Sequence, residues 1–326
     1  MIYSKKPGVD VGKIAGLASR SYGKGVVSGI GGFAGIFDPS VFGFKDMVLA
    51  AGADGVGTKV KIAQALDKHD TVGIDLVAMN ADDVVTCGAR PLFFLDYIAI
   101  GKARPGIVEE IVKGIVDGCE MAGCALLGGE TATMPAIYDD GEYDLAGFCV
   151  GGVERDGIID GSEIVPGDVV LGLESSGIHS NGYTTARRVL LEEGKMKLGD
   201  YIAELGRTLG EELLEPTRIY AKALVYAMAH VRPKGMAHVT EGGIMGNIRR
   251  VLPQGMSFVK TGKWPVPPIF DIIRKTGNLD DAEMDRVFNM GIGMVVIVDP
   301  AHAAEFARLL KGHGINAYHI GEVVKA

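Results

Sequence analysis

The chain of 326 residues is 47% hydrophobic, and its 33 Lys and Arg against 41 Asp and Glu give a net charge of −8. This length and composition can bury a large core in two domains, while the acidic balance without a long basic block argues against nucleic acid as a partner. The sequence contains neither a signal-peptide core nor an apolar run of roughly 18 residues, so we expect a cytoplasmic protein without membrane contact.

Apolar periodicity predicts strands and helices that alternate along the chain. In the first half we expect strands at residues 47–51, 92–100, 125–127 and 145–153, and helices at 59–66, 74–85 and 106–121. In the second half we expect strands at 169–173, 293–298 and 317–324, and helices at 184–193, 216–229 and 301–313. Residues 156–168 are rich in Gly, Asp, Ser and Pro, which marks a boundary. The pattern predicts an αβ protein with two domains, 1–160 and 161–326.

The first candidate site is a glycine-rich segment at residues 29–35, which includes Gly31 and Gly32. Glycine tolerates positive φ angles, so backbone N–H groups here could form a concave site for an anion. An ordinary flexible loop before the next strand is an equally good interpretation. The segment is not a Rossmann fingerprint, because no adequate strand precedes it and no helix clearly follows.

A second glycine-rich segment, residues 52–59, has the two-glycine spacing of a P-loop but ends in Thr58-Lys59, the reverse of the required order. We therefore reject a P-loop. What remains is Asp54 at a strand end, beside Gly55, Gly57 and a helix N-terminus, which suits a magnesium phosphate complex. The alternative is an ordinary Asp turn.

Residues 73–85 are apolar around almost the whole helix, yet they contain Asp75, Asp82 and Asp83. Asp75 precedes the other two by roughly two turns, so these carboxylates can share a face. A buried carboxylate is costly unless it is paired or metal-bound, which favours binding of a hard cation. The alternative is an acidic first turn and a solvated helix end.

Glu130 is a further acid, placed after two glycines at the end of a short apolar strand. Together with Asp54 and Asp83 it could supply oxygen ligands to Mg²⁺, whose shell combines a few carboxylates with water and nucleotide phosphate. We predict that these three carboxylates converge on one magnesium site.

Two histidines, His179 and His238, lie in glycine-rich turns before expected helices. Such turns expose backbone donors, so each imidazole could stand over an anionic group and move a proton near neutral pH. A structural hydrogen bond is about equally plausible for each. The other five histidines have no such context and are interpreted as surface or packing residues.

The segments that carry this chemistry resemble those of the aminoimidazole ribonucleotide synthetase family, over nearly the whole chain and in the expected order. The matching segments are residues 8–10, 31–33, 54–59, 69–79, 91–97, 128–132, 143–151, 158–161, 175–183, 216–220 and 288–294. One departure is Glu241, which occupies the first of three places after Thr240 where the family usually has glycine.

The resemblance implies an α+β amino-terminal domain that forms a barrel-like core with its copy in a homodimer, followed by an α+β domain that completes the active-site cleft. It implies that ATP with Mg²⁺ phosphorylates the formyl amide oxygen of formylglycinamidine ribonucleotide, after which a nitrogen of the same substrate closes the imidazole ring of aminoimidazole ribonucleotide, in purine biosynthesis. Phosphate charge must be neutralised, two ends of one substrate aligned, and protons moved.

By matching position, the resemblance implies metal binding by Asp54, Asp83 and Glu130, and active-site roles for His179 and His238. The residues that we assign to nucleotide binding are Gly31, Gly32, Asp54, Gly55, Gly57, Thr58, Lys59, Asp75 and Thr131. The family also has a functional Lys near its amino terminus, for which Lys24 is our candidate and Arg20 a competing one.

Two alternatives remain. One is another ATP-dependent phosphorylating enzyme of the same superfamily, such as selenophosphate synthetase, thiamine-monophosphate kinase or a hydrogenase maturation factor. The segment 29–35 has no Cys, and the chain ends in Val323-Val324-Lys325-Ala326 without a terminal Cys, which disfavours the first and the last of these. The other alternative is a protein that binds a nucleotide without turnover.

Overall fold

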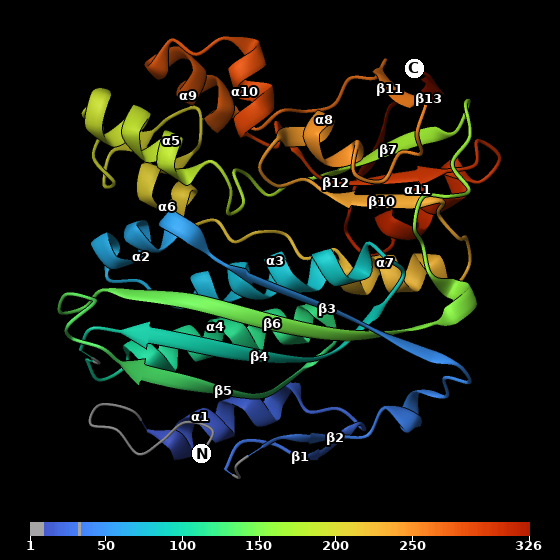
Figure 1. The fold of residues 1–326 in the computed structure, drawn as a ribbon. Helices are drawn as coiled ribbons and strands as arrows, with labels where there is room; N and C mark the ends of the chain where they lie inside the picture. The colour runs from blue at the N-terminus through green and yellow to red at the C-terminus, as the bar shows by residue number, and fades with distance from the viewer. Residues whose placement is uncertain (1–9, 32–33, 103) are drawn as a thin grey trace. The chain divides into compact units, whose positions relative to one another are not determined.

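The computed structural model describes residues 10–31, 34–102 and 104–326, and it divides into two compact units (Figure 1). Unit 1 runs to Val85 and continues over Ala89–Gly157, and unit 2 comprises Thr86–Gly88 and Ile158–Ala326. The short segment joins unit 2 because the backbone N–H of Ile159 donates to the carbonyl of Cys87 at 3.0 Å. The boundary expected after residue 160 thus lies close to the observed one.

Unit 1 is built on a four-stranded sheet in the order β3-β6-β4-β5. The strands are β3 (Met47–Gly55), β4 (Arg90–Ile100), β5 (Ala125–Thr133) and β6 (Tyr143–Glu154). Within this sheet β4 and β5 are the parallel pair, and the helix α4 (Ile107–Ala122) lies between them in the chain. The smaller elements are α1 (Val11–Ala18), η1 (Ser19–Ser21), β1 (Val26–Ser28), β2 (Ile36–Phe37), η2 (Pro39–Phe42), η3 (Gly57–Lys59), α2 (Val60–Leu66) and η4 (Arg155–Gly157).

Helices α3 (Val72–Val85) and α4 (Ile107–Ala122) pack side by side along the sheet of unit 1 (Figure 1). Their backbones approach closely at two glycines. A Cβ at Gly73 would lie 2.3 Å from the backbone nitrogen of Ile115, and a Cβ at Gly114 would lie 2.3 Å from the carbonyl oxygen of Asp70. Because α3 contacts the sheet and α4 at once, almost all of its surface is buried, as its apolar sequence predicts.

The other face of this sheet carries exposed apolar side chains. Leu49 on β3 is 61% exposed and Phe148 on β6 is 45% exposed. Phe148 pairs with Ala53, which shares a strand face with Leu49, so the two side chains lie on one surface. Exposed apolar area of this kind marks an interaction surface more often than an isolated residue does.

Unit 2 is built on an antiparallel five-stranded sheet in the order β10-β12-β7-β13-β11. The strands are β7 (Val169–Glu174), β10 (Gly235–His238), β11 (Met256–Lys260), β12 (Ile292–Val298) and β13 (Ala317–Lys325). Every residue of β12 is buried, as its continuous apolar sequence predicts for an inner strand.

Helices surround the sheet of unit 2, with α11 against β7 and β13 and α8 against β10 and β12. The helices are α5 (Tyr183–Arg187), which continues as the π-helix η5 (Arg188–Glu193), α6 (Leu209–Leu213), α7 (Ala221–Met228), α8 (Gly243–Ile248), α9 (Pro268–Gly277), α10 (Asp281–Val287) and α11 (Ala303–Lys311). A short hairpin of β8 (Tyr201–Ile202) and β9 (Arg207–Thr208) precedes α6. The predicted α+β class is confirmed.

Among the predicted elements that differ from the structure, two bear on candidate site residues. Strand β5 continues to Thr133, so Glu130 lies within the strand and not at its end, because parallel pairing with β4 extends to Ile100. The helix expected over residues 216–229 begins only at Ala221. Pro216 accepts a 2.6 Å hydrogen bond from Ser176 Oγ, so the start of this segment supports the turn that carries His179 instead.

Candidate functional site

The structure brings Asp54 and Asp83 to the same junction, where β3 passes α3. A Cβ at Gly52 would lie 3.9 Å from the Asp83 Cβ, and the Asn80 amide donates to the Asp54 carbonyl at 3.3 Å. Both acids are exposed, and Asp54 Oδ1 also accepts the backbone N–H of Gly55 at 2.7 Å. Two exposed carboxylates on neighbouring elements offer oxygen ligands of the kind that Mg²⁺ prefers.

Glu130 does not lie at this junction. Strand pairing places Asp54 opposite Gly147, Gly147 opposite Asp96, and Glu130 opposite Tyr97 on the next strand. Asp54 and Glu130 therefore occupy the two edge strands, three strand spacings or about 14 Å apart. Within residues 10–31, 34–102 and 104–326, no group of three His, Cys, Asp or Glu side chains could hold a metal ion. Asp54, Asp83 and Glu130 therefore do not converge on one site within a single chain.

Lys59 and Asp75 form an ion pair in the interior of unit 1. Lys59 Nζ lies 2.8 Å from Asp75 Oδ1, and both side chains are 0% exposed. We expected a hard cation to offset the buried charge of Asp75, but the structure uses Lys59 for this purpose. A phosphate contact by Lys59 and a nucleotide contact by Asp75 remain predictions.

The segment around Lys59 has the local form of an anion-binding turn. Gly57 adopts φ +74°, a conformation that favours glycine, and it begins η3 directly after β3. Gly57 and Thr58 are both exposed residues of this turn. Together with the oxygen ligands of Asp54 and Asp83, this turn fits a magnesium nucleotide.

The remaining residues assigned to nucleotide binding are spread over unit 1. Thr131 is buried within β5. Gly31 is exposed and has φ +129°, as a concave backbone site requires, whereas Gly32 lies outside the described residues. The assignment of both glycines to phosphate remains a prediction.

Of the two amino-terminal cations, Arg20 is engaged in surface ion pairs. Its guanidinium lies 2.8 Å from Asp117 and 2.8 Å from Glu120, and hydrogen bonding to Asp117 raises the pKa of Arg20. Lys24 is exposed, and its amine lies 5.4 Å from the centre of the Phe42 ring. This difference favours Lys24 as the cation that a ligand could recruit.

In unit 2, His179 lies in a strained and well-supported segment, residues 175–182, which we call the His179 turn. The imidazole is 2% exposed and the residue has φ +68°. Its Nε2 accepts the backbone N–H of Ser176 at 3.1 Å, so the neutral ring carries its proton on Nδ1. The ring rests on β12, since a Cβ at Gly293 would lie 2.3 Å from the His179 Cε1.

His238 is the last residue of β10 and is 5% exposed. It pairs with Met294 on β12, and the backbone N–H of Val239 donates to the carbonyl of Gly293 at 2.9 Å. His179 and His238 therefore lie at the same end of β12, around residues 293 and 294. The sequence separates these histidines by 59 positions (238 − 179), and sheet topology brings them together.

The turn after His238, residues 238–243, tolerates Glu241 in place of glycine; we call it the His238 turn. Only Gly242 and Gly243 have left-handed φ angles, +95° and +61°, whereas Glu241 is exposed and does not need one. Glu241 therefore places a surface carboxylate at a position of the turn that needs no left-handed φ angle.

Asn289 is a residue of this region that we did not assign from the sequence. Its amide donates to the carbonyls of Gly177 and Ile178 at 2.9 and 3.0 Å, and its Oδ1 accepts from Ser175 Oγ at 3.0 Å. Asn289 is buried and thereby fixes the His179 turn from a distant segment. The available signal was the segment 288–294, which we used only for the resemblance.

The described part of the chain has no helix that is both long and apolar enough to cross a membrane.

Comparison with known proteins places both units in one group. Residues 37–153 match the family described as AIR synthase related protein, N-terminal domain, and residues 165–326 match AIR synthase related protein, C-terminal domain. Among solved structures, thiamine-monophosphate kinase from Stenotrophomonas maltophilia K279a has a TM-score of 0.70 at 18% identity, covering 100% of this chain and 96% of that one. The hydrogenase maturation protein HypE of E. coli has a TM-score of 0.65 at 17% identity, covering 96% and 90%. These likenesses show the fold.

Sequence relatives are much more similar. A phosphoribosylformylglycinamidine cyclo-ligase of Bifidobacterium animalis subsp. lactis (strain AD011) is 51% identical over 317 residues, which cover 97% of this chain and 92% of the relative. One of Geobacillus kaustophilus (strain HTA426) is 54% identical over 301 residues, which cover 92% and 87%. Because such relatives share about half of the residues over nearly the whole length, the chain belongs to the phosphoribosylformylglycinamidine cyclo-ligase family of AIR synthase related proteins.

Proposed function

We propose that the chain uses ATP to close the imidazole ring of aminoimidazole ribonucleotide from formylglycinamidine ribonucleotide, with release of ADP and phosphate. The observation that carries this proposal is the identity of about half of all residues with named cyclo-ligases, across both units and not in one alone. The superfamily alternatives have only structural likeness at 18% identity or less in their support.

The proposed reaction transfers the terminal phosphoryl group of ATP to the formyl amide oxygen of the substrate. A nitrogen of the same substrate then attacks the activated carbon, the C–O bond breaks, and phosphate leaves with that oxygen while the ring nitrogen loses a proton. The protein must therefore hold two reacting ends in contact and handle a proton. No redox partner is needed for this balance.

We assign the binding of magnesium and nucleotide to the junction of Asp54 and Asp83. Magnesium, when bound, would neutralise phosphate charge there. The support is the packing of β3 against α3 beside the two acids, the exposure of both acids, and the left-handed turn at Gly57. Glu130 stays a predicted ligand, although its strand lies at the other edge of the sheet.

We assign proton handling to His179 and His238, which lie at one end of β12. In neutral His179, Nε2 accepts the hydrogen bond from the Ser176 backbone N–H, so the ring proton is on Nδ1. Nδ1 is therefore the ring nitrogen that would donate a proton. Lys24 is the proposed amino-terminal cation.

We further propose a homodimer that forms through the exposed apolar face of the unit 1 sheet. Leu49 and Phe148 lie on this face, and covering them would remove apolar area from water. Sedimentation equilibrium tests it: Leu49→Glu should yield monomers, and an unchanged dimer would contradict the assignment of this face. We expect the reaction to take place in the cytoplasm.

The activity is tested by supplying purified protein with ATP, Mg²⁺ and formylglycinamidine ribonucleotide. Aminoimidazole ribonucleotide should form in a dye assay, with one ADP per product in a coupled assay. Substrate-independent ATP hydrolysis, phosphorylation of thiamine monophosphate, or tight ATP binding without turnover would support the alternatives instead.

Residue roles are tested with matched pairs of variants. His238→Ala should lower turnover with little change in ATP affinity, whereas exposed His302→Ala should be neutral. Asp83→Ala should weaken binding of the magnesium nucleotide, whereas exposed Asp140→Ala in the same unit should not. Unchanged kinetics in both His238→Ala and Asp83→Ala would remove these assignments.

A further inference from the structure

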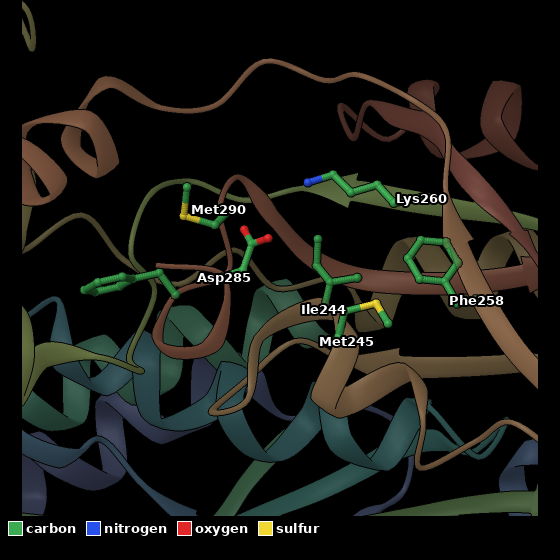
Figure 2. A pocket seen from close by; sticks show the side chains of 7 residues that line it. Ile244, Met245, Phe258, Lys260, Asp285 and Met290 are labelled. Carbon is green, nitrogen blue, oxygen red and sulfur yellow. The ribbon is translucent and has the colours of Figure 1, made fainter. Parts of the chain in front are cut away.

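The His179 turn of unit 2 is held from two sides by segments that lie far from it in the chain. On one side is a small hollow between α8, β11 and the end of α10, with a largely apolar lining that includes Ile244, Phe258 and Phe288 (Figure 2). Its volume is about 20 Å³, room for about one water molecule, so it is a packing feature and not a ligand site. The Phe288 ring of this lining packs against the turn, since a Cβ at Gly182 would lie 2.7 Å from it.

On the other side lies residues 216–220, an irregular segment between α6 and α7 that we call the α7 leader. The Pro216 carbonyl accepts a hydrogen bond from Ser176 Oγ at 2.6 Å, and the hydroxyls of Thr217 and Ser180 share a hydrogen bond at 3.0 Å. Both partners belong to the His179 turn. The α7 leader is therefore a support for this turn and not merely a connection between two helices.

Tyr220 is the residue of the α7 leader that reaches the imidazole. Its side chain is 0% exposed, and the centre of its ring lies 6.3 Å from the centre of the His179 ring, with the two planes tilted by 54°. The Tyr220 hydroxyl donates to the Glu174 carbonyl at 2.7 Å, and Glu174 is the last residue of β7, directly before the turn. This hydrogen bond fixes the phenol against the strand from which the turn starts.

Gly293 on β12 leaves the space in which the two side chains meet. A Cβ at this position would lie 2.3 Å from Tyr220 Oη and 2.3 Å from His179 Cε1. Because both atoms lie so close to one point, the phenol oxygen and the edge of the imidazole lie beside each other. His179 also has a φ of +68°, which is costly for a residue other than glycine and persists only where neighbouring groups enforce it.

We propose that Tyr220 is a positioning residue for His179, an inference that rests on the proposed role of His179 in proton handling. The phenol fills the space beside the imidazole and is itself fixed by Glu174. The ring thereby keeps the one orientation in which Nε2 accepts the Ser176 backbone N–H and Nδ1 carries the proton. Without the hydroxyl the ring has room to turn, and a reacting group misplaced by about 1 Å can cost about 100-fold in rate.

The first test observes His179 itself, in the whole chain with ¹⁵N-labelled histidine, at a mildly alkaline pH where imidazoles are neutral. The signals of His179 are those that disappear in His179→Asn. The unsubstituted chain should show one tautomer with the proton on Nδ1, and Tyr220→Phe, which keeps the aromatic ring, should add the tautomer with the proton on Nε2. A mixture of tautomers before any substitution, or identical His179 signals in Tyr220→Phe, would overturn the proposal.

Tyr183→Phe is the matched control. Tyr183 is also buried in unit 2, and its hydroxyl donates to the Leu213 carbonyl at 2.7 Å, so this variant loses a hydrogen bond of the same kind and length. Both variants should lose similar stability in urea melts, but only Tyr220→Phe should change the His179 signals. An equal change of these signals in Tyr183→Phe would show a general loosening of unit 2 and would contradict a positioning role for Tyr220.

Turnover separates this inference from the proposed function. Tyr220→Phe should lower kcat for ring closure about tenfold or more, with the KM for ATP unchanged because we assign the nucleotide to unit 1. Altered His179 signals with a normal kcat would support the positioning by Tyr220 and remove the proposed role of His179. A lowered kcat with unaltered His179 signals would overturn the inference and leave the proposed function intact.

Discussion

The buried pair of Lys59 and Asp75 gives the sharpest quantitative test of unit 1. With 2.8 Å between Nζ and Oδ1 and both side chains 0% exposed, removal of one partner leaves an uncompensated charge in the interior. The Coulomb attraction at this distance is about 6 kcal/mol for an effective dielectric constant of about 20. Because desolvation offsets part of it, we expect Lys59→Met or Asp75→Asn to lower the free energy of unfolding of unit 1 by about 3–5 kcal/mol.

The double variant Lys59→Met with Asp75→Leu should cost much less than the sum of the two single changes, because no buried charge remains. Hydrogen exchange of amides in α3 and β6 at increasing urea concentrations measures the free energy of unfolding of unit 1 separately from that of unit 2. Lys61→Met is the matched control: its ion pair with Glu142 is 40% and 39% exposed, so its loss should cost no more than about 1 kcal/mol.

Two results would refute this reasoning. Additive costs in the double variant would show that the two side chains do not neutralise each other. A Lys59→Met protein of normal stability with weakened ATP binding would show that Lys59 contacts phosphate, as the sequence alone suggested.

Three further predictions address packing, the His179 turn and pH. Gly114→Ala should destabilise unit 1 by about 1–3 kcal/mol in the same exchange experiment, because its Cβ would meet a backbone oxygen, whereas Gly16→Ala, with no atom within 4 Å, should not. Asn289→Ala should destabilise unit 2 by about 2–4 kcal/mol in urea melts followed by Trp264 fluorescence, since it releases several buried hydrogen bonds; an unchanged midpoint would contradict its anchoring role. The hydrogen bond from Arg155 lowers the pKa of Asp46 below its usual 3.8. The stability that this hydrogen bond confers is therefore fully present above pH 3.8 and is lost as the pH falls through the lowered pKa. Asp46→Asn should therefore reduce the loss of unfolding free energy at acidic pH. An unchanged pH dependence would be inconsistent with a stabilising pair of Asp46 and Arg155.

The fold was largely predictable where the local sequence decides the structure. Strand β12 is a continuous apolar run bounded by glycine and proline, and α3 is apolar around its circumference, so burial on all sides follows directly. The domain boundary was expected from a different signal, the Gly-, Asp-, Ser- and Pro-rich composition of residues 156–168.

The site was predictable only in part, because it depends on which strands become neighbours. Sequence reasoning proposed Asp54 and Asp83, whose elements pack together, and also Glu130, which the strand order puts at the opposite edge of the sheet. It could not foresee that Lys59 would neutralise Asp75 from 16 positions away, because periodicity does not identify a partner on another element.

The His179 turn shows the same limit in unit 2. Pro216 suggested a helix start by its own preference, but its carbonyl supports Ser176 instead. Asn289 holds the turn from 110 residues further along the chain (289 − 179), and its segment indicated the resemblance but not this contact. Contacts over such distances are set by the whole sheet and not by the neighbouring sequence.

Oxygen transfer tests the proposed reaction most directly. Formylglycinamidine ribonucleotide labelled with ¹⁸O at the formyl oxygen would be converted with ATP and Mg²⁺, and the phosphate released would be analysed by mass spectrometry. Activation of the amide oxygen predicts one ¹⁸O in each phosphate that accompanies a closed ring. Phosphate without label, with the ¹⁸O recovered in water, would contradict the mechanism proposed for this chain.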